Sequence, residues 1–423
     1  MTATDAHSAI NAVYRIESPR PIAGLARMVR DVGLAEELAQ DALVAALERW
    51  PQSGVPDNPG AWLMATAKHR AVDVLRRGKR LERKHEELGR EVDREMSPDL
   101  DAALDDDVGD DLLRLVFTAC HPVLSMEARV ALTLRLLGGL TTGEIARAFL
   151  VPEPTIAQRI VRAKRTLADA RVPFEVPRGA ELAARLSSVL QVIYLIFNEG
   201  YSATAGDDWV RPALCEDALR LGRILAGLAP EEPEVHGLVA LMEIQASRLR
   251  ARTGPAGEPV LLLDQNRALW DRVLIGRGLA ALDRAEELDG GRGSYTLQAA
   301  IAACHARART PEETDWTRIA ALYQDLAQLS PSPVVELNRA VAVAMASGPA
   351  AGLELVDALL PEPSLAGYHL LPSVRGDLLA KLGRLEEAGK EFQRAASLTK
   401  NARERKLLLE RAAACARGEP PPR

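Results

Sequence analysis

The polar residues best placed to do chemistry lie in the segment LTTGEIARAFLVPEPTIAQRIVRAKRTL at 140–167. Thr141, with Glu144 three residues later, forms a capping box, which predicts the start of a helix. The Val-Pro pair at 151–152 breaks that helix, and Pro154 suits the first turn of a second one, where its missing N–H costs nothing. The outward face of the second helix then carries a hydroxyl, an amide and three guanidiniums, which belong to Thr155, Gln158, Arg159, Arg162 and Arg165.

These side-chain types are the ones that a major-groove recognition helix needs. Hydroxyls and amides near the start of such a helix contact base edges, and guanidiniums bind guanine or phosphate. The segment therefore predicts a helix-turn-helix that reads duplex DNA. A helical hairpin with a basic face and no DNA partner is the alternative.

A second basic segment lies nearer the N-terminus. From Trp62 to Lys84 there are eight Lys or Arg residues, whereas from Asp99 to Asp111 there are seven Asp residues and no basic one. Five more basic residues, against one Asp, fall within 154–171. Two segments therefore suit a polyphosphate, and the acidic stretch between them is typical of a linker. Two solvated helix faces joined by a disordered loop would give the same charge order.

The elements that must position these residues are helical. Of the 423 residues, 47% are hydrophobic but only 4% are aromatic, and the excess consists of Ala and Leu, both strong helix formers. This composition predicts an all-α chain of two to four domains. One helix should cover 33–50 and end at Pro51, and another should run from Ala61 to about Arg77 and stop at Gly78.

Composition also excludes several classes of protein. The net charge of −6 argues against a wholly basic nucleic-acid binder. We find no apolar run of about 18 residues that would span a membrane, and the N-terminus lacks the pattern of a signal peptide. The four cysteines stand far apart without a CxxC pair, which fits a reducing cytoplasm and predicts neither disulfide nor metal site.

After Pro173 the chain consists of Ala- and Leu-rich helices separated by Pro and Gly. The segment 368–398 has the small residues and the aromatic of a tetratricopeptide-type helix–turn–helix, at Gly376, Leu379, Gly383, Ala388, Phe392 and Ala395. A weaker copy starts near Asn338. We therefore expect a helical repeat region, with a generic helical bundle as the alternative.

Together these segments resemble a known family. Residues 10–171 are similar to the extracytoplasmic-function (ECF) type of RNA polymerase sigma factor, which keeps sigma domains 2 and 4. The resemblance implies that 33–50 docks on the β′ clamp helices, that 61–77 recognises and opens the −10 element, and that 140–167 reads the −35 element and touches the β flap. The acidic stretch resembles the linker between the two domains. The resemblance thus divides the chain into four segments. These are domain 2 at 8–84, the linker at 85–110, domain 4 at 111–172 and a helical extension at 180–423.

The resemblance also implies roles for individual residues. The clamp contact falls on Glu36, Glu37, Gln40 and Asp41. The −10 contact falls on Lys68, His69, Arg70, Arg76 and Arg77, where His69 stands in place of the Asn common in ECF factors. The −35 contact falls on Thr155, Gln158, Arg159, Arg162 and Arg165. Trp62 is expected in the core rather than as a platform for stacked bases.

The long C-terminal part resembles one ECF subgroup that carries a tetratricopeptide-like extension. The segments 191–225 and 294–306 look like signatures of that extension. The resemblance implies protein contacts, with the polymerase, with a protein regulator or with the sigma domains, in a cytoplasmic protein that is not an enzyme and needs no cofactor.

Two other functions are compatible with parts of the sequence. A free-standing helix-turn-helix regulator with a ligand-sensing helical domain would leave the basic helix 61–84 without a role, and a pure scaffold would leave the charge order unexplained. The adjacent pairs Cys120–His121 and Cys304–His305 diverge on a helix and predict no zinc site. Glu199, Asp207 and Asp208 are expected to cap helices rather than form an acid/base or cation site.

Overall fold

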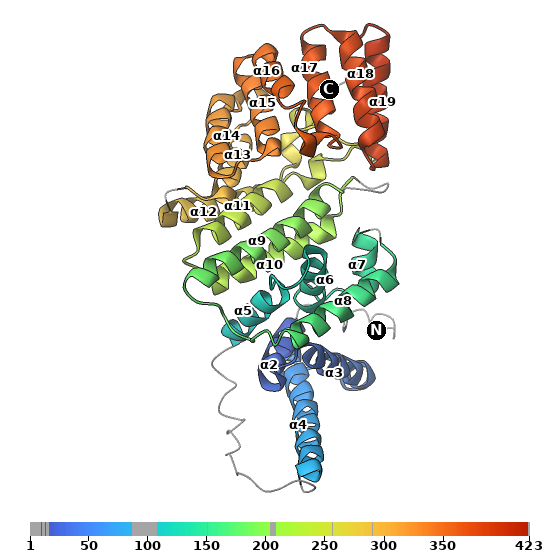
Figure 1. Ribbon diagram of the computed structural model, residues 1–423, viewed down its shortest axis with the longest axis vertical. Coiled ribbons are helices and arrows are strands. Elements are labelled where there is room, and N and C mark those ends of the chain that lie inside the picture. Colours follow the sequence, from blue (N-terminus) through green and yellow to red (C-terminus); the bar gives the residue numbers. More distant parts are fainter. Residues whose placement is uncertain are drawn as a thin grey trace. The chain divides into compact units, whose positions relative to one another are not determined.

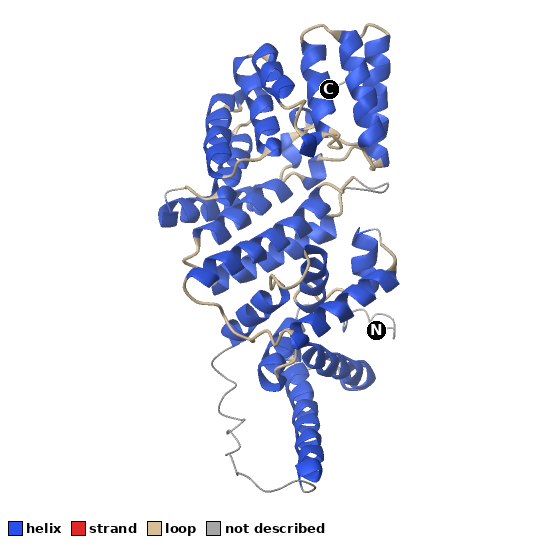
Figure 2. Cartoon of the chain, in the orientation of Figure 1, coloured by secondary structure: helices blue, strands red, loops and turns tan. Residues whose placement is uncertain are grey.

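The computed structural model describes residues 10, 13, 17–86, 108–149, 151–203, 209–255, 257–289 and 291–421. This part of the chain contains helices and no strands (Figure 2), which confirms the all-α prediction. The chain divides into two compact units, Met1–Ile193 and Tyr194–Arg423. The boundary falls within helix α9, Ala180–Tyr201.

Three helices of the first unit share a core. They are α2 (Pro19–Val29), α3 (Val32–Ser53) and α4 (Pro59–Glu86). The Asp31 side chain accepts a hydrogen bond from the backbone N–H of Leu34 at 2.9 Å and so caps α3. Pro51 lies inside the last turn of α3, which ends only at Ser53. The expected stop at Pro51 is therefore two residues early.

The expected stop of α4 at Gly78 is wrong. The helix continues through that residue to Glu86 (Figure 1). A glycine inside a helix costs only about 1 kcal/mol of helix stability relative to alanine, and the flanking Arg, Lys and Leu residues are strong helix formers. The basic residues near Gly78 thus extend the same helix instead of entering a loop. The predicted linker 85–110 lies mostly outside the described residues, apart from the end of α4 and the first turn of the next helix.

Among the described residues between α4 and α9, there are four further helices. They are α5 (Val108–Ala119), α6 (Met126–Leu136), α7 (Thr142–Phe149) and α8 (Glu153–Asp169). The capping box is present, because Glu144 N–H donates to Thr141 Oγ1 at 3.2 Å and Thr141 N–H donates to Glu144 Oε2 at 2.7 Å. The inward residues of α8 are Ile156, Ile160, Ala163 and Leu167, all buried as expected. The predicted helix-turn-helix is therefore confirmed.

The second unit holds the end of α9 and a series of helices, most of which pack on their neighbours in sequence (Figure 1). The α-helices are α10 (Pro212–Leu228), α11 (Pro233–Ala246), α12 (Arg272–Asp289), α13 (Ser294–Arg307), α14 (Trp316–Leu329), α15 (Pro333–Ser347), α16 (Pro349–Ala358), α17 (Leu370–Lys381), α18 (Leu385–Leu398) and α19 (Ala402–Ala416). Short 3₁₀ helices are η1 (Leu249–Ala251), η2 (Leu262–Asp264), η3 (Arg267–Leu269), η4 (Pro311–Glu313) and η5 (Pro363–Leu365).

The segment predicted as a repeat forms the helical pair α17 and α18. Phe392 is fully buried between these helices, and a Cβ atom on Gly376 would lie only 2.9 Å from its ring. Gly376 is therefore required for the close approach of α17 to α18. The predicted helix–turn–helix is present, and its assignment to the tetratricopeptide class stays a prediction.

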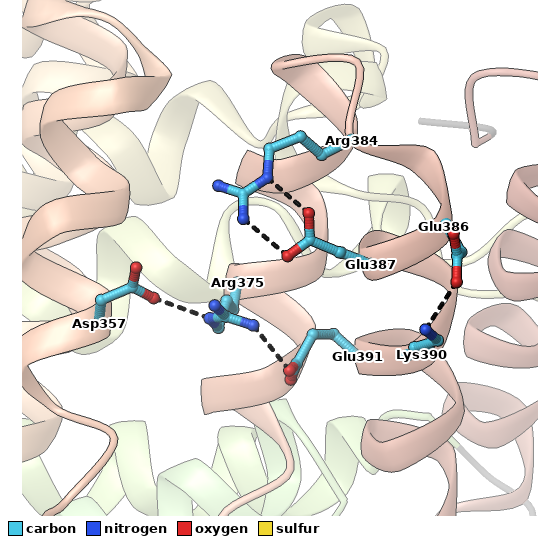
Figure 3. Close-up of polar contacts among 7 residues, drawn as sticks. All are labelled: Asp357, Arg375, Arg384, Glu386, Glu387, Lys390 and Glu391. Carbon is cyan, nitrogen blue, oxygen red and sulfur yellow. Dashed lines mark hydrogen bonds and ion pairs between the residues drawn. The ribbon is translucent and has the colours of Figure 1, made fainter.

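Ion pairs tie α16, α17 and α18 together (Figure 3). Arg375 donates from Nε to Asp357 at 2.8 Å and from Nη1 to Glu391 at 2.9 Å. The Arg375 side chain is 17% exposed, so these contacts are less screened than surface pairs. The pairs Arg384–Glu387 and Lys390–Glu386 beside it are local and exposed.

Two arginines of the second unit bind the ends of helices. Arg267 donates from Nη1 to the carbonyl oxygens of His305, at 2.8 Å, and Ala308, at 2.6 Å, where α13 ends. Arg252 donates from Nη2 to the carbonyl oxygen of Tyr201, the last residue of α9, at 3.0 Å. Since the carbonyl ends of helices carry partial negative charge, these guanidiniums are stabilised by the fold itself and do not require a ligand.

Candidate promoter-DNA and polymerase interfaces

The outer face of α8 holds the residues predicted to read duplex DNA. Thr155, Gln158, Arg162 and Arg165 are exposed, and Arg159 is half-buried. Arg165 pairs with Asp169 one turn later at 3.5 Å, but both side chains remain more than two-thirds exposed, at 81% and 71%. The structure thus gathers all five residues on one helix, with four of them open to a partner.

Sequence reasoning missed Val161 on this face. It is 64% exposed, although valine is usually buried. It follows Gln158 by three residues and precedes Arg165 by four, so it shares their side of the helix. An exposed apolar residue among polar ones suits contact with the methyl group of thymine. The sequence did contain the signal, because helical periodicity in this segment predicts that Val161 faces outward.

The predicted −10 residues all lie on α4. His69, Arg76 and Arg77 are exposed, whereas Lys68 and Arg70 are half-buried. Arg70 Nη1 lies 2.8 Å from Asp41 Oδ2 on α3. The structure therefore joins one predicted −10 residue to one predicted clamp residue. These two predicted sets occupy adjacent helices.

Trp62 on α4 packs against the buried Trp50 at the end of α3. Their ring centroids lie 5.2 Å apart with an edge-to-face angle of 66°. Trp62 is half-buried rather than in the core, and this contact fixes its ring within the helix pair. The cations and polar groups of α4, rather than this ring, are thus the exposed features of the helix.

The four predicted clamp residues divide between two sides of α3. Glu37 and Asp41, one turn apart, are exposed together with Val44, which is 51% exposed. Gln40 is half-buried and donates from Nε2 to Glu36 Oε1 at 2.5 Å. Glu36 itself is buried. The exposed side of α3 is thus acidic with one apolar residue, and Val44 was not among the predicted contacts.

The buried Glu36 carboxylate binds two cations from other helices. Its Oε1 accepts from Arg135 Nε of α6 at 2.5 Å, and its Oε2 pairs with Lys164 Nζ of α8. The Glu36 side chain is only 3% exposed. Two positive charges offset the cost of burying one carboxylate. Glu36 therefore links α3 to the helix-turn-helix.

A second buried carboxylate makes a related contact. Asp111 at the start of α5 lies 3.2 Å from Arg27 Nε of α2 and 2.5 Å from Arg114 Nη1 of its own helix. Its side chain is 6% exposed. Asp111 ends the aspartate run and directly follows the predicted linker 85–110, and it is part of the packed unit.

The first half of α9 is bonded to α5 and its following turn. Arg185 Nη2 donates to the carbonyl oxygen of Phe117 at 2.9 Å, and Ser188 Oγ donates to that of Cys120 at 2.9 Å. Arg129 Nη1 in turn donates to Ser188 Oγ at 2.9 Å. The first residues of the predicted extension are thus hydrogen-bonded to α5, to the turn after it and to α6.

Cys120 and His121 have different hydrogen-bond partners. Cys120 Sγ contacts Thr133 Oγ1 at 3.4 Å, whereas His121 Nδ1 accepts from the Val123 N–H at 3.1 Å. Burial raises the pKa of Cys120 to about 11, which keeps the thiol protonated and a poor ligand. Within the described residues, no three His, Cys, Asp or Glu side chains gather as a metal site.

Of the three residues expected to cap helices, the structure describes Glu199, which lies within α9. Glu199 pairs with Arg211, while Asp207 and Asp208 lie outside the described residues. No helix in the described parts of the chain is long and apolar enough to cross a membrane.

Comparison with known families shows to which protein family these helices belong. Residues 14–81, which include α2, α3 and most of α4, match sigma-70 region 2. Residues 114–167, which include α6, α7 and most of α8, match sigma-70 region 4. The chain belongs to the sigma-70 family of RNA polymerase sigma factors. A sigma factor acts in promoter-specific transcription initiation together with core RNA polymerase and promoter DNA.

Two further similarities concern the rest of this sigma factor. Residues 185–286 match a family of unknown function, DUF6596. A protein of Rhizobium meliloti (strain 1021), described as uncharacterized, is 46% identical over 387 residues, which cover 91% of each chain. The long C-terminal helical region is therefore shared with that relative. Below, α2–α4 are called region 2 and α5–α8 region 4.

Proposed function

We propose that this sigma factor is of the ECF type and uses α8 to read the −35 element and α4 to hold the −10 element. The observation that carries the proposal is the exposed face of α8, since its amide, hydroxyl and guanidinium groups match the needs of a major-groove reader. Val161 adds an apolar group suited to a thymine methyl. The protein supplies recognition only, and catalysis belongs to the polymerase.

The role proposed for α4 follows from its charge and exposure. Opening the −10 element exposes single-stranded bases, which proteins hold with cations along the backbone and with polar pockets. Arg76 and Arg77 supply exposed cations, and His69 supplies an exposed donor. Lys68 and Arg70 are proposed to contact the strand from the side nearer to α3.

The exposed acidic side of α3 is the proposed contact with the β′ clamp helices. Glu37 and Asp41 present carboxylates one turn apart, and Val44 adds an apolar surface beside them. A protein interface of this kind needs an apolar centre with a polar rim. Gln40 and Glu36 would join this contact only after region 4 has moved from α3, and the β flap is proposed to bind region 4.

The helical region 180–423 is proposed to regulate or assist initiation through protein contacts, by analogy with the ECF subgroup that carries such extensions. We assign domain 2 to 8–84, the linker to 85–110 and domain 4 to 111–172. We expect the protein in the cytoplasm, where core polymerase acts on DNA.

A binding assay separates this proposal from a free-standing regulator. A labelled pool of genomic promoter fragments is titrated with the protein alone, with core polymerase alone and with both. A sigma factor should give sequence-selective retention only when both proteins are present. Tight and selective binding by the protein alone, with half-site symmetry, would favour the regulator instead.

A further inference from the structure

Three arginines of the second unit share two aromatic rings. The guanidinium carbon of Arg252 lies 3.7 Å from the centre of the Tyr201 ring, and that of Arg248 lies 5.9 Å from the same centre. The Arg248 carbon also lies 5.7 Å from the centre of the Trp270 ring, and the Arg267 carbon lies 4.9 Å from it. We call these five residues the arginine cluster. Arg248 stands at its middle, because it shares one ring with each of the other two arginines.

Arg248 differs from its two neighbours in how its charge is held. Arg252 and Arg267 donate to carbonyl oxygens at helix ends. Arg248 is only 6% exposed, and its Nη2 donates to Oε1 of Gln245, a neutral side chain. Its Nε is buried without a hydrogen-bond partner. The fold thus offers this buried guanidinium a neutral acceptor instead of a helix end or an acid.

The surroundings of Arg248 contain no compensating negative charge. Within the described part of the chain, the ionisable groups that act on it are Tyr201, Arg252 and Tyr323, none of which is a carboxylate. Burial lowers the pKa of Arg248, and the positive charge of Arg252 also lowers it. An arginine nevertheless stays protonated in a protein. Contacts with ring faces offset only part of the cost of burying an ion, so the cluster holds an uncompensated cation.

Five buried N–H groups in and beside the arginine cluster lack a hydrogen-bond partner. They are Nε of Arg248, Arg252 and Arg267 and Nε1 of Trp209 and Trp270. Trp209 belongs with them, because its ring centre lies 5.5 Å from the guanidinium carbon of Arg252. An oxyanion only accepts hydrogen bonds and forms its strongest ones with guanidinium groups. Both the charge and the hydrogen-bonding groups of the cluster therefore suit an oxyanion.

The cluster has a covered side and a side that solvent reaches. Trp270 is only 3% exposed, so it lies with Arg248 in the interior. Tyr201, Trp209 and Arg252 are half-buried. A small ion that enters between them would meet Arg252 first and then Arg248.

We propose that the arginine cluster binds a small ligand through an oxyanion group, a phosphate or a carboxylate, that pairs with the buried Arg248. Arg252 is the second cation of this site, at its half-buried side. The site lies entirely within the second unit, so it does not depend on the function proposed for the sigma regions. It would give the C-terminal region a chemical signal to which it can respond.

Titration of the full-length protein with simple oxyanions tests the proposal. Inorganic phosphate or sodium acetate is added at constant pH, with sodium chloride keeping the ionic strength constant. A ligand that binds only the folded protein raises the midpoint of thermal unfolding in a concentration-dependent way. We expect one or both anions to raise it by several degrees, and tryptophan emission to change with saturation, because Trp270 lies in the site. A response to phosphate alone assigns a phosphate ligand, and a response to acetate alone assigns a carboxylate.

Arg248→Met distinguishes a binding cation from a structural one. Methionine is also a long side chain, but it has no charge. Without added anion the variant should be at least as stable as the wild-type protein, because an unpaired buried charge has been replaced by an apolar group. It should no longer respond to either anion. Arg250→Met is the matched control, since it makes the same change at an exposed position of η1 and should respond like the wild-type protein.

Equal responses of the wild-type protein and Arg248→Met would overturn the proposal, because the anion would then act on the protein in general. The absence of a saturable response to either anion in the wild-type protein would overturn it too. A loss of stability in Arg248→Met without added anion would show that the fold itself uses this charge, which also contradicts the proposal. The measurement contains neither polymerase nor DNA, so each of these results leaves the proposed function intact.

Discussion

Arg185 on α9 donates a hydrogen bond to the carbonyl oxygen of Phe117 on α5, and its guanidinium also lies 5.9 Å from the centre of the Phe117 ring. These contacts bond the first turns of the C-terminal region to region 4. A cut just before α9 would therefore remove part of the region 4 structure. A truncation that is meant to isolate the sigma regions has to retain the first half of α9.

Replacing Arg185 by Ala should destabilise region 4. The substitution leaves the buried Phe117 carbonyl without its donor, at a cost of about 1–3 kcal/mol. Hydrogen exchange of the α5 amides measures the effect. Glu181→Gln is the control, because it weakens the 3.0 Å ion pair of Arg185 with a 64% exposed carboxylate and leaves the Phe117 bond in place. Equal protection of α5 in both variants would contradict the prediction.

Shortening the Val161 side chain to that of alanine should abolish the ability of the holoenzyme to distinguish thymine from uracil in the −35 element. Uracil lacks only the methyl group that Val161 is proposed to contact. In the wild-type holoenzyme, uracil at the contacted position should weaken binding several-fold, whereas V161A should bind both templates equally. Scanning single uracil substitutions through the element locates the position. No difference between the templates at any position would refute the contact.

Reversing the charge of Arg159 and Arg162 should weaken promoter binding by the holoenzyme and reduce its dependence on salt. Each lost phosphate contact lowers the slope of log K against log salt by about one. Arg178→Glu provides a control with the same charge change at an exposed position outside α8. An unchanged slope in the α8 variant would remove this face from DNA recognition.

Gly376→Ala should destabilise the C-terminal unit by about 1–3 kcal/mol, since the added methyl must displace the buried Phe392 ring. Gly389→Ala is the matched control on α18. Its Cβ would meet no atom closer than 3.4 Å, so helix propensity predicts no loss and up to about 1 kcal/mol of gain. Thermal unfolding of the two variants should give opposite shifts. Equal shifts would show that the helices separate more easily than their packing indicates.

Acid should destabilise the C-terminal unit through His305. Burial, together with the nearby Arg248 and Arg267, lowers its pKa to about 3 from 6.5, so the folded protein holds it neutral. Between these values the unfolded chain binds a proton that the folded chain does not. The free energy of unfolding should therefore fall as the pH decreases below 6.5, by up to about 1.4 kcal/mol per pH unit.

His305→Phe isolates this effect, because it keeps a ring against Trp316 and removes the titrating nitrogens. Stability is compared at several pH values between 7 and 5, a range chosen to lie mostly within the window in which the two states differ in protons. The wild-type protein should lose stability more steeply than the variant. Parallel curves would mean that His305 gains its proton as readily in the folded protein as in the unfolded one.

The sequence was sufficient wherever the signal was local. The capping box at Thr141 and the inward residues of α8 follow from spacings of three and four residues, and the structure confirms them. Gly376 and Phe392 were likewise recognised from the spacing of one helical pair. In each case, the residues that decide the structure lie within one or two helices of each other.

Contacts between distant segments could not be predicted. Glu36 has the helical position of a polar surface residue, and its burial depends on Arg135, 99 residues later. Asp111 directly follows the predicted linker, and nothing in its acidic neighbours predicts its ion pair with Arg27 of α2. The roles of the exposed residues depend on partners outside the chain, so no contact within the chain could reveal them.

The most direct test of the sigma function is transcription in vitro. Purified core polymerase, this protein and the promoter fragments recovered in the binding assay are combined, and run-off transcripts are mapped. We predict transcripts with defined start sites that require the protein and are lost when Arg159 and Arg162 are reversed in charge. Transcripts that are identical with and without the protein, or that persist unchanged in the charge-reversed variant, would contradict promoter recognition through α8.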